Sequence, residues 1–151
     1  MTKTNRNTPK FIEGGISIDD RGEVHFVNDF NFSKVKRFYM VTFHKAGIIR
    51  AWHAHKLEEK YVFVVKGAAI VGAVAIDNFT HPSQKAYVHR HILSAKRPVI
   101  FYIPKGYGNG FCPLTADTQL IFFATRTLEQ SKNDDYRYNP RYWDIWKIQE
   151  G

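Results

Sequence analysis

Two histidines separated by one residue stand in the segment 50–60, between an arginine and a lysine. His53 and His55 lie in a run typical of a strand, where side chains two residues apart point to the same face. Arg50 precedes them, and Lys60 follows after a pair of glutamates. The segment therefore brings together bases, an acid partner and a guanidinium suited to phosphate. We expect a site inside a β-barrel.

Short strands are the elements that would position this segment. Runs rich in β-branched and aromatic residues are separated by Gly, Pro, Asn and Asp at spacings that indicate an all-β barrel or sandwich. We expect strands at 24–27, 35–43, 48–55, 60–65, 68–76, 86–93, 99–103 and 119–124. Only 128–135 and 141–149, near the C-terminus, are compatible with short helices.

The 151 residues, 44% of them hydrophobic, are enough for one folded domain with a sizeable core. We assign this domain to residues 11–151, after a polar and flexible N-terminus at 1–10. No apolar run reaches the ~18–20 residues of a membrane span, and the N-terminus lacks the apolar core of a signal peptide. The single cysteine, Cys112, fits a reducing cytoplasm and is expected to be buried.

A formal net charge of +8 favours an anionic partner. The basic residues are scattered, and the sequence contains no helix-turn-helix, RNP or zinc-finger pattern, so we do not expect a nucleic-acid partner. A nucleotide diphosphate held in a pocket would account for the charge equally well. Part of the charge can also be ordinary solvated surface.

Two spaced motifs carry a resemblance to a known superfamily. The first is G-x5-H-x-H-x3-E-x7-G, from Gly47 to Gly67, and the second is P-x-G-x2-N, from Pro104 to Asn109. In this order and separation they resemble the two motifs of the cupins, which implies a jelly-roll or β-barrel fold. In metal-binding cupins the first motif's histidines and glutamate, here His53, His55 and Glu59, bind the ion together with a histidine of the second motif.

The second motif here has Asn109 in place of that histidine. A carboxamide oxygen is a poor ligand for transition metals, so we expect no metal and no other cofactor. Three ligands could still hold an ion with open positions. A metal-dependent small-molecule cupin therefore remains an alternative.

A narrower resemblance concerns cupins that act on nucleotide sugars. The K-R-x-Y segment at 36–39, the R-A-W-H-A-H-K segment at 50–56 and the D-D-R-G turn at 19–22 resemble motifs of the dTDP-sugar 3,4-ketoisomerases. Segments 60–67 and 103–111 resemble the dTDP-4-dehydrorhamnose 3,5-epimerases. The likeness runs from about Ile18 to Trp146.

The resemblance implies an isomerase or epimerase of a dTDP-linked 4-keto-6-deoxy sugar, in cell-surface polysaccharide synthesis. It also implies a homodimer, because N-terminal strand exchange occurs in these families. The catalytic residues would be His53, His55, Tyr39 and Lys60. The substrate-binding residues would be Arg50, Arg21, Arg37 and Asn109.

Several positions depart from the epimerase pattern. Phe122 stands where those enzymes have a tyrosine acid on a late strand, and Asn139 aligns with the aspartate that pairs with the catalytic histidine. Asp134, Asp135 and Asp144 are nearby in the sequence. We therefore expect ketone migration or inversion at a single centre. A sugar-nucleotide-binding cupin without catalysis is the second alternative.

Overall fold

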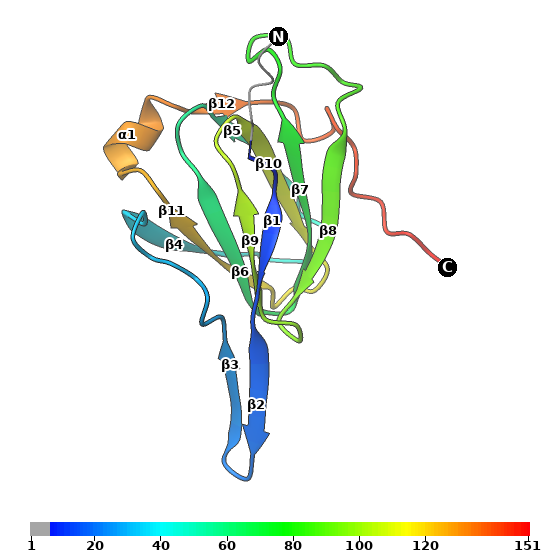
Figure 1. Cartoon of the computed structure of the whole chain (residues 1–151). Helices are drawn as coiled ribbons and strands as arrows, with labels where there is room; N and C mark the ends of the chain where they lie inside the picture. Colours follow the sequence, from blue (N-terminus) through cyan, green and yellow to red (C-terminus); the bar gives the residue numbers. More distant parts are fainter. Residues whose placement is uncertain (1–6) are drawn as a thin grey trace.

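The computed structural model describes residues 7–151, which form two facing five-stranded antiparallel sheets and a separate hairpin (Figure 1). In spatial order the first sheet contains β1 (Lys10–Glu13), β9 (Val99–Ile103), β6 (Lys60–Lys66), β11 (Gln119–Ala124) and β4 (Arg37–Thr42). The second contains β12 (Tyr136–Arg137), β5 (Arg50–His55), β10 (Tyr107–Pro113), β7 (Ala68–Ala75) and β8 (Val88–Ser94). The one helix of the described residues is α1 (Leu128–Lys132).

Alternation along the strands sends apolar side chains between the sheets. On β4, for example, Tyr39 and Val41 pack inward, whereas Phe38 and Met40 are exposed on the outer face. The core between the sheets contains Val62, Val64, Ala69, Val71, Ala73, Leu93, Val99, Phe101, Ile103, Leu120 and Phe122. This two-layer arrangement is the expected jelly-roll class, with the sheets not closed into a continuous barrel.

The outer face of the second sheet is covered by the C-terminal segment. Trp52, on β5, is fully buried against Trp143 and Trp146, with ring centroids 5.3 Å from each. Gly72 makes room for this layer, because a Cβ there would lie 2.7 Å from the Trp52 ring. Both faces of β5 are therefore packed, which fixes the orientation of the strand that carries the two histidines.

Three expectations from the sequence need correction or extension. Residues 141–149 form no helix, because the aromatic side chains lie across the sheet and the indoles of Trp143 and Trp146 donate to the carbonyls of Ser83 and Pro140. The second motif leads into strand β10, which begins at Tyr107 and which the sequence did not predict. Residues 1–6 of the expected flexible N-terminus lie outside the described residues, and Lys10 already belongs to β1.

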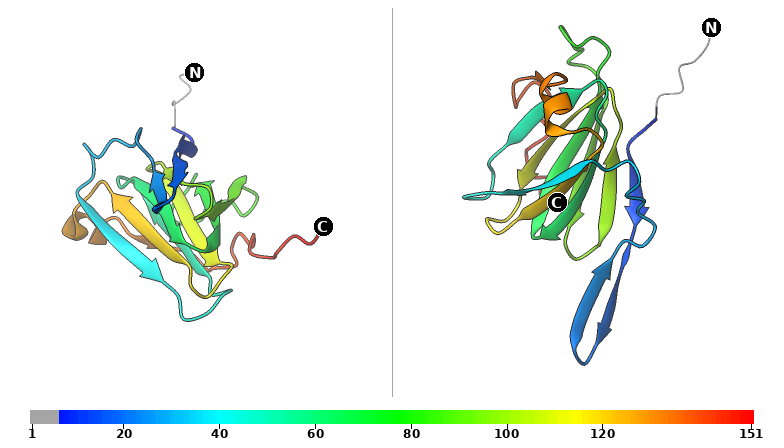
Figure 2. Two further views of the ribbon diagram at one scale, coloured as in Figure 1. Left: turned by 90° about the horizontal axis from the view of Figure 1, so that it is seen from below. Right: turned by 90° about the vertical axis from the view of Figure 1, so that its left-hand side faces the viewer.

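A hairpin of β2 (Gly15–Asp19) and β3 (Gly22–Phe26) projects away from the two sheets (Figure 2). Its side chains are mostly exposed, including Ile18 and Val24. No helix of residues 7–151 is long and apolar enough to cross a membrane.

Candidate functional site

The two histidines point from β5 into the space between the sheets. Their neighbours Trp52 and Ala54 are fully buried on the opposite face. As the period of two predicts, His53 and His55 share one face. They differ in burial, since His55 is 5% exposed whereas His53 is half-buried.

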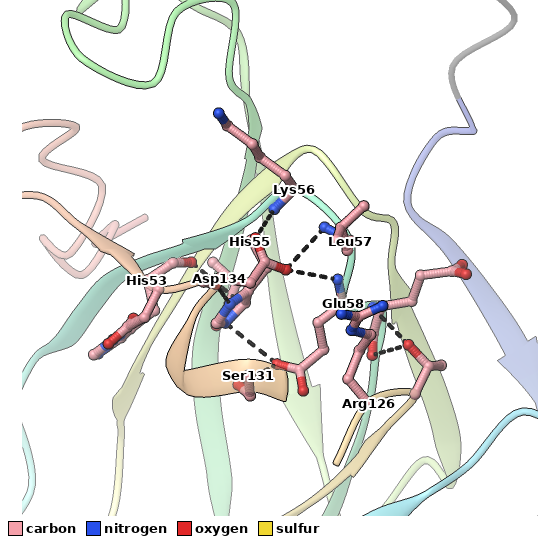
Figure 3. Close-up of polar contacts among 12 residues, drawn as sticks. His53, His55, Lys56, Leu57, Glu58, Arg126, Ser131 and Asp134 are labelled. Carbon is pink, nitrogen blue, oxygen red and sulfur yellow. Dashed lines mark hydrogen bonds and ion pairs between the residues drawn. The ribbon is translucent and has the colours of Figure 1, made fainter. Parts of the chain in front are cut away.

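A tight turn after His55 is held by one carboxylate. Asp134, just beyond α1, accepts hydrogen bonds from the backbone N–H groups of Lys56, Leu57 and Glu58, at 2.7, 2.9 and 3.1 Å (Figure 3). Three donors on a buried carboxylate make a strong anchor, because hydrogen bonds to charged groups are about twice as strong as neutral ones. The turn between the two sheets is therefore fixed by a residue far away in the sequence.

Asp134 also fixes the tautomer of His55. Nδ1 of His55 donates to the backbone carbonyl of Asp134, so Nδ1 carries the proton in the neutral ring. Nε2 makes no hydrogen bond among the described residues and lies 3.4 Å from Oε2 of Glu58. Burial, followed by the charge of Lys60, lowers the pKa of His55, while the bond to Asp134 and the charge of Glu58 oppose this shift. Both ring nitrogens thus face protein groups.

The glutamate beside the histidines is Glu58 rather than Glu59. The Glu58 side chain is fully buried, and its oxygens contact Arg37 at 3.2 Å and the Ser131 hydroxyl at 3.2 Å. Glu59 instead accepts a hydrogen bond from the Tyr102 hydroxyl. His53, His55 and Glu59, the counterparts of the ligands in metal-binding cupins, are therefore not brought together, and among residues 7–151 no three His, Cys, Asp or Glu side chains are grouped to hold a metal.

His53 is placed to act as a base. Burial, then the charge of Lys60, lowers its pKa to about 4, so the imidazole is neutral at pH 7. The backbone carbonyl of His53 accepts a hydrogen bond from Nδ2 of Asn109 at 3.1 Å, across the β5–β10 ladder. Oδ1 of Asn109 is buried and has no hydrogen-bond partner among the described residues, so it remains available as an acceptor.

Lys60 and Tyr39 lie opposite the histidines on the first sheet. Burial lowers the pKa of Lys60 to about 8, against the charge of Glu58, which raises it. The Lys60 ammonium lies 5.9 Å from the centre of the Tyr39 ring and 5.8 Å from that of Phe122. Burial, followed by the charge of Glu58, raises the pKa of Tyr39. The phenol is therefore protonated at neutral pH and can donate a proton.

Phe122 occupies the inward-facing position expected for the late-strand residue. It lies on β11 directly opposite Tyr39 on β4, and the two rings stack with centroids 5.1 Å apart. Phe122 itself is fully buried. The phenol missing from β11 is thus present on the neighbouring strand.

The three predicted arginines have different positions. Arg37 is tied to Glu58 and to the carbonyl of Arg126, with its guanidinium 5.0 Å from the centre of the Tyr39 ring. Arg50 is exposed at the start of β5, where it pairs with Phe111 of β10, and its charge lowers the pKa of Tyr39. Arg21 belongs to the turn of the projecting hairpin, where it pairs with Asp19 at 2.6 Å, and is not brought to the site of its own chain.

Two further charged residues lie near His53, of which Asp135 was noted in the sequence and Arg137 was missed. Arg137 pairs directly opposite His53 across the β5–β12 ladder, and Asp135 lies 3.0 Å from its Nε. Their charges act on the pKa of His53 in opposite directions, Arg137 lowering it and Asp135 raising it. Asn139, by contrast, bonds the backbone N–H of Arg141. Asp135 was among the nearby carboxylates in the sequence, but only the strand pairing distinguishes it from the others.

A cavity of about 700 Å³ lies elsewhere, beside the C-terminal segment. Its lining includes Ile49, Ile70, Cys112, Arg141 and Trp146, and none of the predicted catalytic residues. Cys112 is buried there, as expected. The predicted catalytic residues therefore lie outside this cavity.

Comparison with known proteins gives one family. The family model described as dTDP-4-dehydrorhamnose 3,5-epimerase matches residues 11–148. No curated protein sequence matches the chain.

Solved structures share the fold at low sequence identity. A dTDP-4-dehydrorhamnose 3,5-epimerase from Bacillus anthracis, with TDP and pyrophosphate bound, is 21% identical (TM-score 0.76; 98% of this chain and 90% of that chain covered). A 3'-monoepimerase from Streptomyces bikiniensis, in complex with dTDP-quinovose, is 20% identical (0.71; 100% and 83%). A 3,4-ketoisomerase from Helicobacter canadensis is 17% identical (0.67; 91% and 96%). The predicted fold class is confirmed.

We expect Asp134→Asn to destabilise the protein by about 2–3 kcal/mol, because bonds from three backbone donors to a buried charge are weakened at once. Urea unfolding of the two proteins measures this difference. Asp135→Asn is the matched control, since Asp135 is exposed and pairs only with Arg137 in a surface contact. Equal losses in the two variants would contradict the anchoring role of Asp134.

Proposed function

The chain belongs to the dTDP-4-dehydrorhamnose 3,5-epimerase family, and from this premise we propose that it moves a proton beside the ketone of a dTDP-linked 4-keto-6-deoxy sugar. Family membership confirms the predicted resemblance and the coarser function, an enzyme that isomerises or epimerises a dTDP-sugar. The proposal concerns the reaction itself, a 3,4-ketoisomerisation or the inversion of a single centre. The observation that carries it is the Tyr39 phenol stacked beside the late-strand Phe122, with the neutral His53 on β5 and the buried Lys60 on β6.

His53 acts as the general base. A ketone at C4 acidifies the proton on C3, and a neutral imidazole removes this proton to leave an enediolate. The negative charge that develops on oxygen is stabilised by the Lys60 ammonium, which burial makes effective because water does not screen it. Metal ions are not required for these steps.

Tyr39 donates its own phenolic proton to carbon, and the proton taken up by His53 afterwards restores the phenol through solvent. The raised pKa of Tyr39 keeps the phenol protonated, and delivery at C4, with transfer of the O3 proton to O4, places the carbonyl on C3. Delivery to the opposite face of C3 inverts that centre instead. A second inversion at C5 needs an acid on the late strand, and Phe122 offers none.

Substrate binding is assigned to residues around the mouth of the site. Arg50 suits the diphosphate, since its guanidinium can form two parallel hydrogen bonds to phosphate oxygens. Arg37 is engaged with Glu58 and supports Tyr39 from behind. Oδ1 of Asn109 is available to accept a hydrogen bond from a sugar hydroxyl. The buried Cys112 fits a cytoplasmic enzyme that supplies a precursor for cell-surface polysaccharide.

A homodimer accounts for two exposed features. The outer face of the first sheet exposes Phe38 by 69% and Met40 by 56%, next to Phe32 at 60%, and apolar patches of this kind mark protein interfaces. The projecting β2–β3 hairpin would extend the contact. Arg21 in its turn would then reach the site of the partner subunit rather than its own.

Incubation with dTDP-4-keto-6-deoxyglucose in deuterated water tests the reaction. We expect NMR to show a 3-keto sugar or one inverted centre, with deuterium at C3 or C4, because Phe122 leaves the late strand without a phenol. Deuterium at both C3 and C5 with both centres inverted would contradict our assignment of Phe122. The absence of exchange would favour the alternative of a sugar-nucleotide-binding cupin without catalysis.

The pH dependence follows from His53 and Lys60. His53 must be deprotonated and Lys60 protonated, so we expect activity to rise through about pH 4 and to fall through about pH 8. Initial rates of deuterium exchange across this pH range provide the measurement.

His53→Ala should reduce turnover by ~10²-fold or more, the scale of general-base catalysis. The same initial rates, measured at neutral pH, check this loss. A variant with wild-type rates would show that another group is the base.

Phe38→Asp should convert the dimer into a monomer, because it places a charge in the apolar interface. Light scattering measures the mass, and Ile92→Asp, on the second sheet, is the exposed control.

Arg21→Ala should weaken dTDP binding about tenfold while the dimer persists, the effect of losing a charge-assisted bond to phosphate. A wild-type monomer in solution would overturn this assembly.

A further inference from the structure

Glu58 is a buried carboxylate to which the reaction above assigns no role. Its side chain is fully buried, and burying a charge is costly unless it is paired. Its partners come from three elements: Arg37 on β4, His55 on β5 and Ser131 on α1. Two of these partners are cationic or can become so. The carboxylate therefore stands behind the site as a fixed negative charge.

We propose that Glu58 is a positioning residue whose negative charge holds protons on His55 and Lys60 and keeps Arg37 against Tyr39. The inference rests on the proposed function, which needs Lys60 charged. It assigns to His55 a role within the protein rather than on the substrate. Glu58 was not among the residues predicted from the sequence.

The geometry around His55 carries the first step. The bond from Nδ1 to the carbonyl of Asp134 leaves Nε2 as the only nitrogen that can gain a proton. Glu58 lies 3.4 Å from Nε2, long for a hydrogen bond but close for two opposite charges. A neutral ring would direct its lone pair toward this carboxylate, whereas a protonated ring is attracted to it. Glu58 therefore favours the imidazolium form against the burial and the Lys60 charge that oppose it.

The second step concerns Lys60 and Tyr39. Burial lowers the pKa of Lys60. The charge of Glu58 is the largest effect that raises this pKa, and the charge of Arg37 lowers it further. Asp135, just before β12, and Arg137, on β12, act on the pKa of Lys60 in opposite directions, Asp135 raising it and Arg137 lowering it. Glu58 also holds the Arg37 guanidinium, which lies 5.0 Å from the Tyr39 ring. One carboxylate thus controls both the charge of Lys60 and the support behind Tyr39.

Glu58→Gln tests this role, because it removes the charge and retains the shape and an acceptor for Arg37. We expect the alkaline limb of activity to move down by about 1 pH unit, the effect of losing an opposite charge a few ångströms away. At pH 8 the turnover number should fall about fivefold, because the protonated fraction of Lys60 falls from about one half to about one tenth. KM should change little, because the diphosphate is bound by Arg50.

Two control variants separate charge from structure. Ser131→Ala removes a hydrogen bond of Glu58 but leaves its charge, so the alkaline limb should stay in place. Glu59→Gln changes the adjacent residue, which bonds Tyr102 away from the site, and should behave like the wild type. Urea unfolding checks that each variant is folded. An unshifted limb in a folded Glu58→Gln protein would overturn the proposal.

The ¹⁵N NMR signals of the His55 ring provide a readout without substrate. In the wild type, Nε2 should take up its proton at a higher pH than in Glu58→Gln, because the carboxylate favours the imidazolium. Ser131→Ala should resemble the wild type in this titration. Identical titrations of wild type and Glu58→Gln would contradict the role of Glu58. No deuterium exchange by the wild type would instead contradict the proposed function, while the NMR titration still decides whether Glu58 acts on His55.

Discussion

The carboxylate of Asp134 is the constraint on which the site depends. It binds three consecutive backbone N–H groups of the turn between β5 and β6, and the carbonyl of the same residue binds His55. That turn crosses from the second sheet to the first, so it sets the position of Lys60 relative to the histidines. Loops between sheets are usually the mobile parts of such folds. Here a charge-assisted anchor makes the crossing part of the rigid scaffold.

Within this scaffold, neighbouring groups need opposite protonation states, and burial affects each of them. Removal from water favours the neutral form of every ionisable group, which suits the role of base proposed for His53 but works against the role of cation proposed for Lys60. The buried charge of Glu58 counteracts the loss of charge on Lys60 more than it changes His53. It raises the pKa of Lys60 and of His55 but does not act appreciably on that of His53. A base and an acid can therefore operate a short distance apart at neutral pH.

The sequence predicted what depends on local periodicity. Alternation placed His53 and His55 on one face, and the spaced motifs indicated the jelly-roll class and the family. Periodicity ends at residue 55, because the chain turns there, and Glu58 rather than Glu59 enters the site. Asp134 and Arg137 lie about 80 residues away in the sequence, and only tertiary structure brings them to the histidines, through a hydrogen bond for Asp134 and through strand pairing for Arg137. Tertiary packing of the tryptophans likewise overrode the helix expected at 141–149.

The stacked pair of Phe122 and Tyr39 shows how one fold can support different products. Two directly paired positions on adjacent strands lie about 4.8 Å apart, so an exchange of tyrosine and phenylalanine between them moves the phenol by one strand spacing. The buried volume hardly changes, because the exchange keeps one tyrosine and one phenylalanine at the stacked pair of positions. The base, the buried lysine and the turn held by Asp134 would be unaffected. A shift of one hydroxyl group can thus change which carbon receives the proton, at little cost to stability.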